Sequence, residues 1–152
     1  MKKSNLRLYI REILKEQTEK LPQSAGIVIV KYIDGKPLYL GLKIYGRYDI
    51  PKGKVDPGED HVKAAKRETL EEAGIESSAL KFKWGMQHYD SKKVRSYVAE
   101  ISPEVEVIIS PNPKTGVWEH HGFNWLTFDD IISKAHKTIK NNLLWAQSVI
   151  EK

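Results

Sequence analysis

The sequence contains no cysteine among its 152 residues. This absence excludes disulfide bonds, thiolate metal sites and cysteine nucleophiles, and it fits a reducing compartment. The chain also has no apolar run near the roughly 20 residues that span a bilayer, and its basic first residues lack the apolar core of a signal peptide. We therefore expect a cytoplasmic protein that has no membrane partner.

Internal repeats, low-complexity tracts and domain linkers are absent as well. The length predicts one domain that can bury a sizeable core. Ahead of that domain, residues 5–17 place Leu6, Ile10, Ile13 and Leu14 at helical spacing. We expect an N-terminal helical extension over residues 1–22, amphipathic and packed on the domain or on a partner, followed by the main domain over residues 23–152.

The remaining chain alternates between strand and helix patterns. Strands are expected at 24–32, 37–43, 79–89, 94–101 and 123–126, with a short edge strand at 105–109. Helices are expected at about 59–73, from a cap at Thr127 to about 136, and at about 140–150. Strands on both sides of one helix, followed by C-terminal helices, predict an α/β fold with a mixed sheet covered on two faces.

Three glutamates gather on one side of the helix expected at 59–73. Glu68, Glu71 and Glu72 fall within an arc of roughly 100° when each residue turns by about 100°. Like charges at this spacing destabilise a helix, so a fold that keeps them together usually supplies cations. Oxygen ligands of this kind suit Mg²⁺ or Mn²⁺. A lone cluster of this type is more often a solvated acidic face, so the surrounding pattern decides.

That pattern is long and specific. Gly53 is followed by Glu59 after six positions, by Arg67-Glu68 after eight more, and then by Glu71-Glu72 and Gly74-Ile75. This spacing resembles the Nudix box, with Thr69 standing where an aliphatic residue is usual. The resemblance implies an α/β/α sandwich in which the box forms a loop, a helix and a loop. It also implies hydrolysis of a nucleoside diphosphate linked to another moiety.

The resemblance assigns roles to the box residues. Glu68, Glu71 and Glu72 match the metal ligands of the family, and Glu68 is also a candidate for polarising the attacking water. Arg67 would not bind metal but would hold a glutamate, either Glu68 or Glu59, in place. Gly53 would allow close approach of the backbone, so that a carbonyl near Lys52 completes the metal shell.

A second stretch resembles the diadenosine tetraphosphate hydrolases within that family. Trp118-Glu119-His120-His121 and the following Gly122 to Leu126 are similar to their H-E-H-x-x-Y-R-W-L segment, although Trp118 replaces a histidine and Phe123 a tyrosine. The resemblance makes Glu119 an additional metal ligand or the general base. We expect His120 and His121 to be substrate neighbours or surface residues, because histidine suits softer ions.

Substrate contacts are expected from residues around the box. Lys52 and Lys54 would reach the polyphosphate, because residues 51–60 also resemble the P-K-G-H-x-x-P-G-E-D of those hydrolases. Tyr48 and Tyr89, with Trp84 as a further candidate, are aromatic side chains that could stack on a base.

Several substrates fit this pattern. A dinucleoside polyphosphate such as diadenosine tetraphosphate is the first expectation. The net charge of +5 suits an RNA 5′ end, from which a pyrophosphate or cap would be removed, and ADP-ribose-type substrates are a further alternative. A non-catalytic nucleotide sensor is the alternative of another class, but all the glutamates of the box are present. The oligomeric state is left open.

Overall fold

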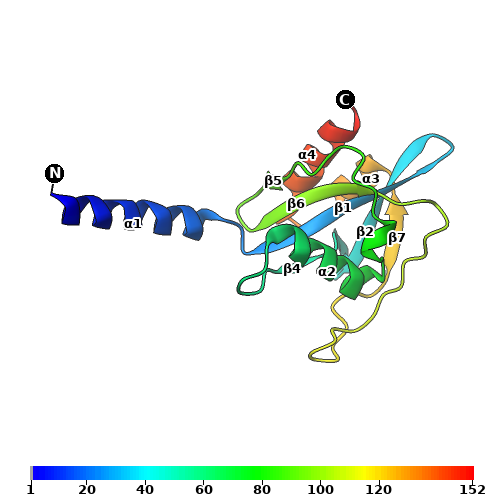
Figure 1. Cartoon of the computed structure of the whole chain (residues 1–152). Coiled ribbons are helices and arrows are strands. Elements are labelled where there is room, and N and C mark those ends of the chain that lie inside the picture. The colour runs from blue at the N-terminus through cyan, green and yellow to red at the C-terminus, as the bar shows by residue number, and fades with distance from the viewer. Residues whose placement is uncertain (1) are drawn as a thin grey trace.

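The fold is a mixed β-sheet between two layers of helices, shown in Figure 1 as a computed structural model of the chain. The structure describes the backbone of residues 2–152 and the side chains of residues 2–13 and 21–152. Helix α2 covers one face of the sheet, and α3 and α4 cover the other. The predicted α/β fold is confirmed. No helix in the described part is long and apolar enough to cross a membrane.

Four α-helices and one 3₁₀ turn lie along the described chain. They are α1 (Lys3–Lys20), α2 (His61–Ala73), η1 (Ser77–Ala79), α3 (Phe128–Ser133) and α4 (Lys140–Ile150). The side chain of Asp60 caps the start of α2 by accepting a hydrogen bond from the Lys63 backbone N–H at 2.8 Å. Gly74 ends the helix in the left-handed conformation, with φ of 67°. The helix thus begins two residues later than predicted, because Asp60 and not an earlier residue is its cap.

The strands form one sheet around β1. They are β1 (Ser24–Ile33), β2 (Lys36–Ile44), β3 (Arg47–Asp49), β4 (Lys52–Lys54), β5 (Tyr89–Asp90), β6 (Val94–Glu100) and β7 (Phe123–Leu126). The order is β3-β2-β1-β6-β5, with β4 also paired to β1 and β7 to β2. The β1–β6 pair is parallel and all the others are antiparallel. The turn between β1 and β2 uses Asp34 and Gly35, both at positive φ, as the Asp-Gly pair predicts.

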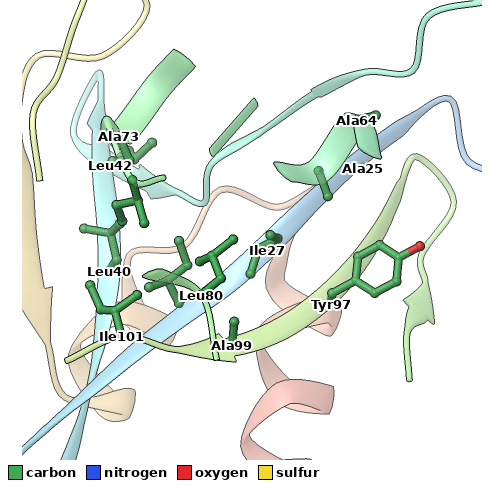
Figure 2. Close-up of a cluster of buried hydrophobic side chains, with 13 residues drawn as sticks. Ala25, Ile27, Leu40, Leu42, Ala64, Ala73, Leu80, Tyr97, Ala99 and Ile101 are labelled. Carbon is green, nitrogen blue, oxygen red and sulfur yellow. The ribbon is translucent and has the colours of Figure 1, made fainter. Parts of the chain in front are cut away.

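Strand β1 is buried on both faces, and its alternate side chains enter two separate cores. Ala25, Ile27 and Ile29 belong to the core beneath α2, which Figure 2 shows in part. Val28 and Val30 point the other way, to the core beneath α3 and α4. Each fully buried aliphatic side chain contributes about 1.5–3 kcal/mol. Both helical layers therefore pack on β1. The same strand pairs with β4, which contains Gly53, the first residue of the Nudix-like stretch.

Helix α1 lies apart from this sandwich. Figure 1 shows it (blue) extending away from the sheet. Leu6, Ile10 and Ile13, the described members of its apolar stripe, are exposed. The expectation that the helix packs on the domain is therefore wrong for these side chains, and the alternative, packing on a partner, stays a prediction.

Two predicted strands are absent from the described chain. Residues 79–89 form turns with one isolated bridge, between Lys81 and Glu100, and only Tyr89 belongs to a strand. Residues 105–109 are a loop whose Val105, Val107 and Ile109 cover the core beneath α2. The alternation of apolar residues that predicted a strand arises because every second side chain of this loop packs against that core. The predicted helix to residue 136 stops at Ser133, because Lys134 leaves helical geometry and its carbonyl accepts a hydrogen bond from the Tyr48 N–H at 2.9 Å.

Candidate functional site

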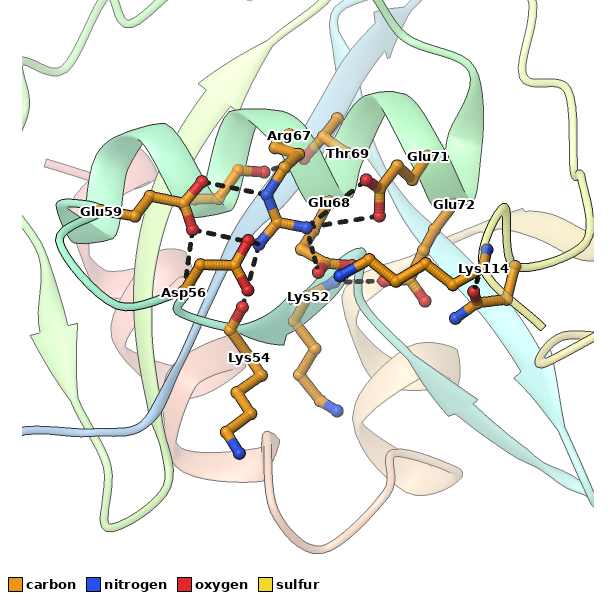
Figure 3. A network of polar contacts seen from close by, with 12 residues as sticks. Lys52, Lys54, Asp56, Glu59, Arg67, Glu68, Thr69, Glu71, Glu72 and Lys114 are labelled. Carbon is orange, nitrogen blue, oxygen red and sulfur yellow. Dashed lines mark hydrogen bonds and ion pairs between the residues drawn. The ribbon is translucent and has the colours of Figure 1, made fainter.

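Helix α2 presents Glu68 and Glu71 away from its packed face, and Glu72 at the buried edge of that face. Ala65, Thr69 and Ala73 are buried against the sheet. The Thr69 hydroxyl donates to the Ala65 carbonyl at 2.8 Å, so the threonine is accommodated where an aliphatic residue was expected. Figure 3 shows Glu68, Glu71 and Glu72 from the same helix directed toward the segment that carries Lys52 and Lys54.

Arg67 joins the acidic side chains of the site (Figure 3). Its guanidinium donates to Glu59 through Nε at 2.9 Å and to Glu68 through Nη1 at 2.8 Å. Longer contacts of 3.4 Å reach Glu71, and Nη2 donates to the Lys54 carbonyl at 2.9 Å. The hydrogen bond from Arg67 lowers the pKa of Glu59 below its usual value. One arginine thus fixes two glutamates and the strand β4 relative to the helix.

Glu72 is the most enclosed carboxyl group of the site. It is 7% exposed, and its Oε1 accepts a hydrogen bond from the Lys52 backbone N–H at 2.8 Å. Burial raises the pKa of Glu72 to about 9, and the nearby Glu68 and Glu119 act in the same direction. Burial also raises the pKa of Glu68, which Arg67 opposes. Burial is therefore the main cause that disfavours the ionised form of both carboxyl groups.

Gly53 leaves the space that Glu68 occupies. A Cβ atom built at this position would overlap the Glu68 carboxyl group. The glycine thus lets the backbone of β4 approach the helix closely, as the sequence predicted, and the group that it admits is the glutamate.

A second segment brings Glu119 and His120 to the same place. Carboxylate oxygens of Glu72 and Glu119 and a ring nitrogen of His120 all lie within 4.8 Å of one another. His120 is buried, and its Nδ1 lies 3.3 Å from Glu72 Oε2. Burial lowers the pKa of His120, which favours the neutral imidazole. His121, in contrast, is exposed on the surface.

These groups surround a hollow of about 290 Å³. It is lined by Lys52, Gly53, Lys54, Asp56, Arg67, Glu68, Glu71, Glu72, Ser110, Asn112, Pro113, Lys114, Glu119 and His120. We call it the carboxylate pocket. The sequence did not identify Ser110, Asn112 or Lys114 as site residues, because their only signal is a polar, proline-bounded loop ahead of Glu119.

The predicted substrate contacts are distributed unevenly. Lys52 and Lys54 line the carboxylate pocket, although the amino group of Lys52 pairs with the buried Asp49 at 3.0 Å. Tyr48 does not line the carboxylate pocket. Its hydroxyl accepts a hydrogen bond from Asn124 at 2.6 Å, and its ring packs against the core beneath α3 and α4. Tyr89 does not line the carboxylate pocket either.

The ring of Tyr89 stacks on Trp145 of α4, with centroids 6.1 Å apart. Trp84 is partly buried against the core beneath α3 and α4. The stacking role proposed for these aromatic side chains stays a prediction, and for Tyr48 and Tyr89 the structure assigns a packing contact.

A family model, the NUDIX domain, matches residues 22–146 of this chain. The chain belongs to the Nudix family. The resemblance carried by Gly53 to Ile75 is therefore confirmed, and the carboxylate pocket of this Nudix domain lies where the box meets the loop that carries Glu119.

Similar curated proteins share one enzyme name. The asymmetrical bis(5′-nucleosyl)-tetraphosphatase of Caenorhabditis elegans is 32% identical, over 80% of this chain and 91% of that protein. The rat enzyme of the same name is 36% identical, over 53% of this chain and 55% of that protein. A crystal structure of a C. elegans Ap4A hydrolase binary complex superimposes with a TM-score of 0.69 at 29% identity, covering 84% of this chain and 98% of that one.

The residues of the carboxylate pocket fit a hard divalent cation. All the box donors are carboxylate oxygens, which Mg²⁺ and Mn²⁺ prefer. Glu72 is buried. Its carboxyl group contacts the Lys52 backbone N–H and the His120 ring, and among the described residues no lysine or arginine side chain pairs with it. A bound cation would supply the missing positive charge and stabilise the ionised form of Glu72.

Proposed function

We propose that this Nudix protein hydrolyses a phosphoanhydride bond of a dinucleoside polyphosphate, with diadenosine tetraphosphate as the first substrate to test. The observation that carries the proposal is the carboxylate pocket, which Glu68, Glu71 and the buried Glu72 of α2 line together with Glu119 from a separate loop. The C. elegans and rat relatives, which bear the name bis(5′-nucleosyl)-tetraphosphatase, support the choice of substrate.

We further propose that Glu68, Glu71, Glu72 and Glu119 hold Mg²⁺ or Mn²⁺. A divalent cation bound here would neutralise charge on the phosphate oxygens as a phosphorus is attacked by water. The contribution of the chain is to fix the ligands before substrate arrives. Arg67 holds Glu68 at 2.8 Å, and the Lys52 N–H holds Glu72 at 2.8 Å, so little rearrangement is needed.

Glu119 is the proposed general base. It is an exposed carboxylate that borders the pocket, and the Asn112 amide holds its Oε1 at 2.9 Å. Its other oxygen can accept a proton from a water in the pocket, which general-base catalysis requires. Lys54 and Lys114 border the same pocket and would contact the polyphosphate. If Glu119 is not the base, Glu68 is the next candidate.

The first test is turnover of diadenosine tetraphosphate with Mg²⁺ by wild type and by Glu72→Gln. We expect the variant to lose at least about a hundredfold in kcat, since a metal ligand is removed. Glu76→Gln, an exposed glutamate after the box, is the matched control and should retain full activity. Unchanged turnover in Glu72→Gln would contradict the assigned site.

A second test concerns the base. Glu119→Gln keeps the shape of the side chain and its contact with Asn112 but cannot take a proton. We expect kcat to fall by about a hundredfold or more and the acidic limb of the pH–rate profile to change. If both the rate and the profile stay as in wild type, Glu119 is not the base, and the corresponding experiment on Glu68 follows.

An RNA 5′ end is the second candidate substrate, and one surface feature favours it. Seven exposed cations line three adjoining hollows on the side of β3 and the α3–α4 connection: Lys43, Arg47, Lys92, Lys93, Lys134, Lys137 and Lys140. We call them the basic strip. The hollows share Lys137 and Arg47, and no carboxylate lines them. Among the side chains that the structure describes, none of the seven is in an ion pair.

The basic strip suits a polyanion longer than a dinucleotide, because phosphate contacts by Lys and Arg drive nucleic-acid binding. The deciding experiment compares diadenosine tetraphosphate with a 5′-triphosphorylated RNA at rising salt. If RNA is the substrate, Lys137→Glu will raise its KM and reduce the salt dependence, while hydrolysis of the dinucleotide is unaffected. A protein that cuts only diadenosine tetraphosphate removes the RNA candidate.

A further inference from the structure

Helix α1 carries a row of apolar side chains that the sandwich leaves uncovered. Leu6, Ile10 and Ile13 are exposed to 46%, 46% and 37%, and Tyr9 is exposed to 57%. With about 100° of turn per residue, these four side chains fall within an arc of roughly 100°. We call them the apolar face of α1. Because the helix extends away from the sheet (Figure 1), this face is available to a partner, and large exposed apolar patches usually mark such a contact.

Basic side chains border the apolar face on one flank. Lys3, Arg7 and Arg11 are exposed, and their spacing of four residues places them on successive turns of the helix. Residues 2–13 contain four cations and one acid, Glu12. A helix with apolar side chains on one side and Lys or Arg beside them can lie in the plane of a membrane interface, with its apolar side toward the acyl chains.

The sandwich adds further cations where α1 joins it. The His61 ring donates to the Pro22 carbonyl at 2.7 Å, and the Ser24 N–H donates to the Lys93 carbonyl at 3.1 Å. The chain is thus fixed to the sandwich directly after the helix, beside the turn that carries Lys92 and Lys93. Both lysines are exposed. Positive charge therefore continues from the helix onto the edge of the sandwich.

Three kinds of partner are candidates for the apolar face, and the charges decide between them. A second copy of the chain would bring its own Lys3, Arg7 and Arg11 to the contact, and like charges would repel. RNA would pair with the cations but would leave the apolar side chains in water. An anionic bilayer suits both features, because the acyl chains cover the apolar face and the lipid headgroups attract the cations.

We propose that α1 attaches this protein reversibly to a membrane surface rich in anionic phospholipids. The helix lies on the surface and does not cross it, and Lys92 and Lys93 add attraction at its C-terminal end. The expectation of no membrane partner rested on the lack of a spanning segment, which does not bear on a helix that lies flat. The inference is independent of the proposed reaction, because no described residue of α1 lines the carboxylate pocket.

The test is co-sedimentation of the full chain with vesicles of phosphatidylcholine, either alone or mixed with phosphatidylserine. We expect binding to the mixed vesicles that weakens as salt rises, and little binding to the neutral ones. Replacing Arg7 and Arg11 together by glutamine should weaken binding to the mixed vesicles by about 25-fold, since each cation near the surface contributes about fivefold.

Two substitutions on opposite sides of the helix separate the apolar face from helix formation. Ile10→Ser lies within the face, whereas Leu8→Ser lies on the other side, where Leu8 is exposed to 58%. Leu8→Ser lowers helix propensity at least as much as Ile10→Ser does. We expect Ile10→Ser to weaken vesicle binding by about tenfold or more, because one aliphatic side chain is no longer buried in the bilayer. Leu8→Ser should bind like wild type.

Several results would overturn the inference. They are equal sedimentation with neutral and mixed vesicles, no sedimentation with either, and equal binding by Ile10→Ser and Leu8→Ser. A wild type that binds RNA but not vesicles would assign the cations to nucleic acid. A dimer that forms without lipid and is lost in Ile10→Ser would assign the apolar face to a second copy. Turnover of diadenosine tetraphosphate in solution should be the same in all these variants.

Discussion

Because of Glu72, the stability of this protein is expected to depend on pH and on the proposed metal ion. Its pKa rises from 4.5 when exposed to about 9 in the fold, so the folded state holds its proton more tightly than the unfolded state. Stability from this group is therefore fully present below pH 4.5 and is lost as the pH rises toward 9, by up to about 1.4 kcal/mol per pH unit. A cation that favours the ionised form would oppose this loss.

We therefore predict that the melting temperature of the metal-free protein falls between pH 5 and pH 9. Glu72→Gln carries no charge and can still accept the hydrogen bond from the Lys52 N–H. Its melting temperature should therefore fall less over this pH range, and at pH 8 the variant should be more stable than wild type. Added Mg²⁺ should raise the melting temperature of wild type more than that of the variant. Thermal melts in chelator and in Mg²⁺ make the comparison, and parallel curves for the two proteins would contradict the prediction.

Gly53 provides a second prediction. Gly53→Ala would drive a Cβ into the Glu68 carboxyl group, so we expect kcat to fall by at least about tenfold because this ligand must move. Gly35→Ala is the contrasting control: nothing lies near its new Cβ, but its φ of +75° is strained for alanine. That variant should lose stability and keep its activity. Normal kcat in Gly53→Ala would show that Glu68 can shift without consequence.

At the residue scale, the sequence predicted the part of the site that is local. Glu68, Glu71 and Glu72 are placed by one helix, so their spacing alone brings them together. His120 was expected to be a substrate neighbour or a surface residue; it is buried beside Glu72, so the surface alternative is wrong, and its role as a substrate neighbour stays a prediction. Its depth depends on how a loop from another part of the chain packs, which no local pattern encodes.

At the scale of the element, α2 carries the three glutamates of the box, and its start depends on one cap. Asp60→Ala removes the hydrogen bond to the Lys63 N–H, and we expect a loss of about 1 kcal/mol, which lowers the melting temperature by roughly 2–4 °C in a domain of this size. Glu76→Ala is the matched control, since Glu76 precedes η1 without a side-chain cap bond. Equal melting temperatures would show that the cap contributes nothing.

Helices and strands could be predicted where the residues of the element itself determine its structure. The last helix has the predicted bounds, Lys140–Ile150, because its apolar spacing matches the core beneath it. Residues 79–89 have an equally clear alternation but form turns, since Gly85 takes a positive φ and Phe82 and Trp84 pack into cores without a strand. Alternation reports which side chains are covered, and it does not report whether the backbone finds a neighbouring strand.

For the whole molecule, the exposed face of α1 leads to a prediction about truncation. Leu6, Ile10 and Ile13 cover nothing in the sandwich. We expect a protein starting at Leu21, which keeps the hydrogen bond between His61 and the Pro22 carbonyl at 2.7 Å, to melt within about 2 °C of the full chain and to retain its kcat. A larger drop in melting temperature would show that the helix packs on the domain.

Backbone hydrogen bonds hold the loop between β6 and β7 at two points, and most of its residues between these points are exposed. The Ile108 N–H donates to the Ala73 carbonyl at 2.9 Å, and Lys43 exchanges two backbone hydrogen bonds with His121 and Gly122. Changes to the loop between Ile108 and His121 can replace or move Asn112, Trp118 and Glu119, while the position of helix α2 stays the same. Substrate preference can therefore diverge between relatives by exchange of about a dozen loop residues on an unchanged hydrolytic frame.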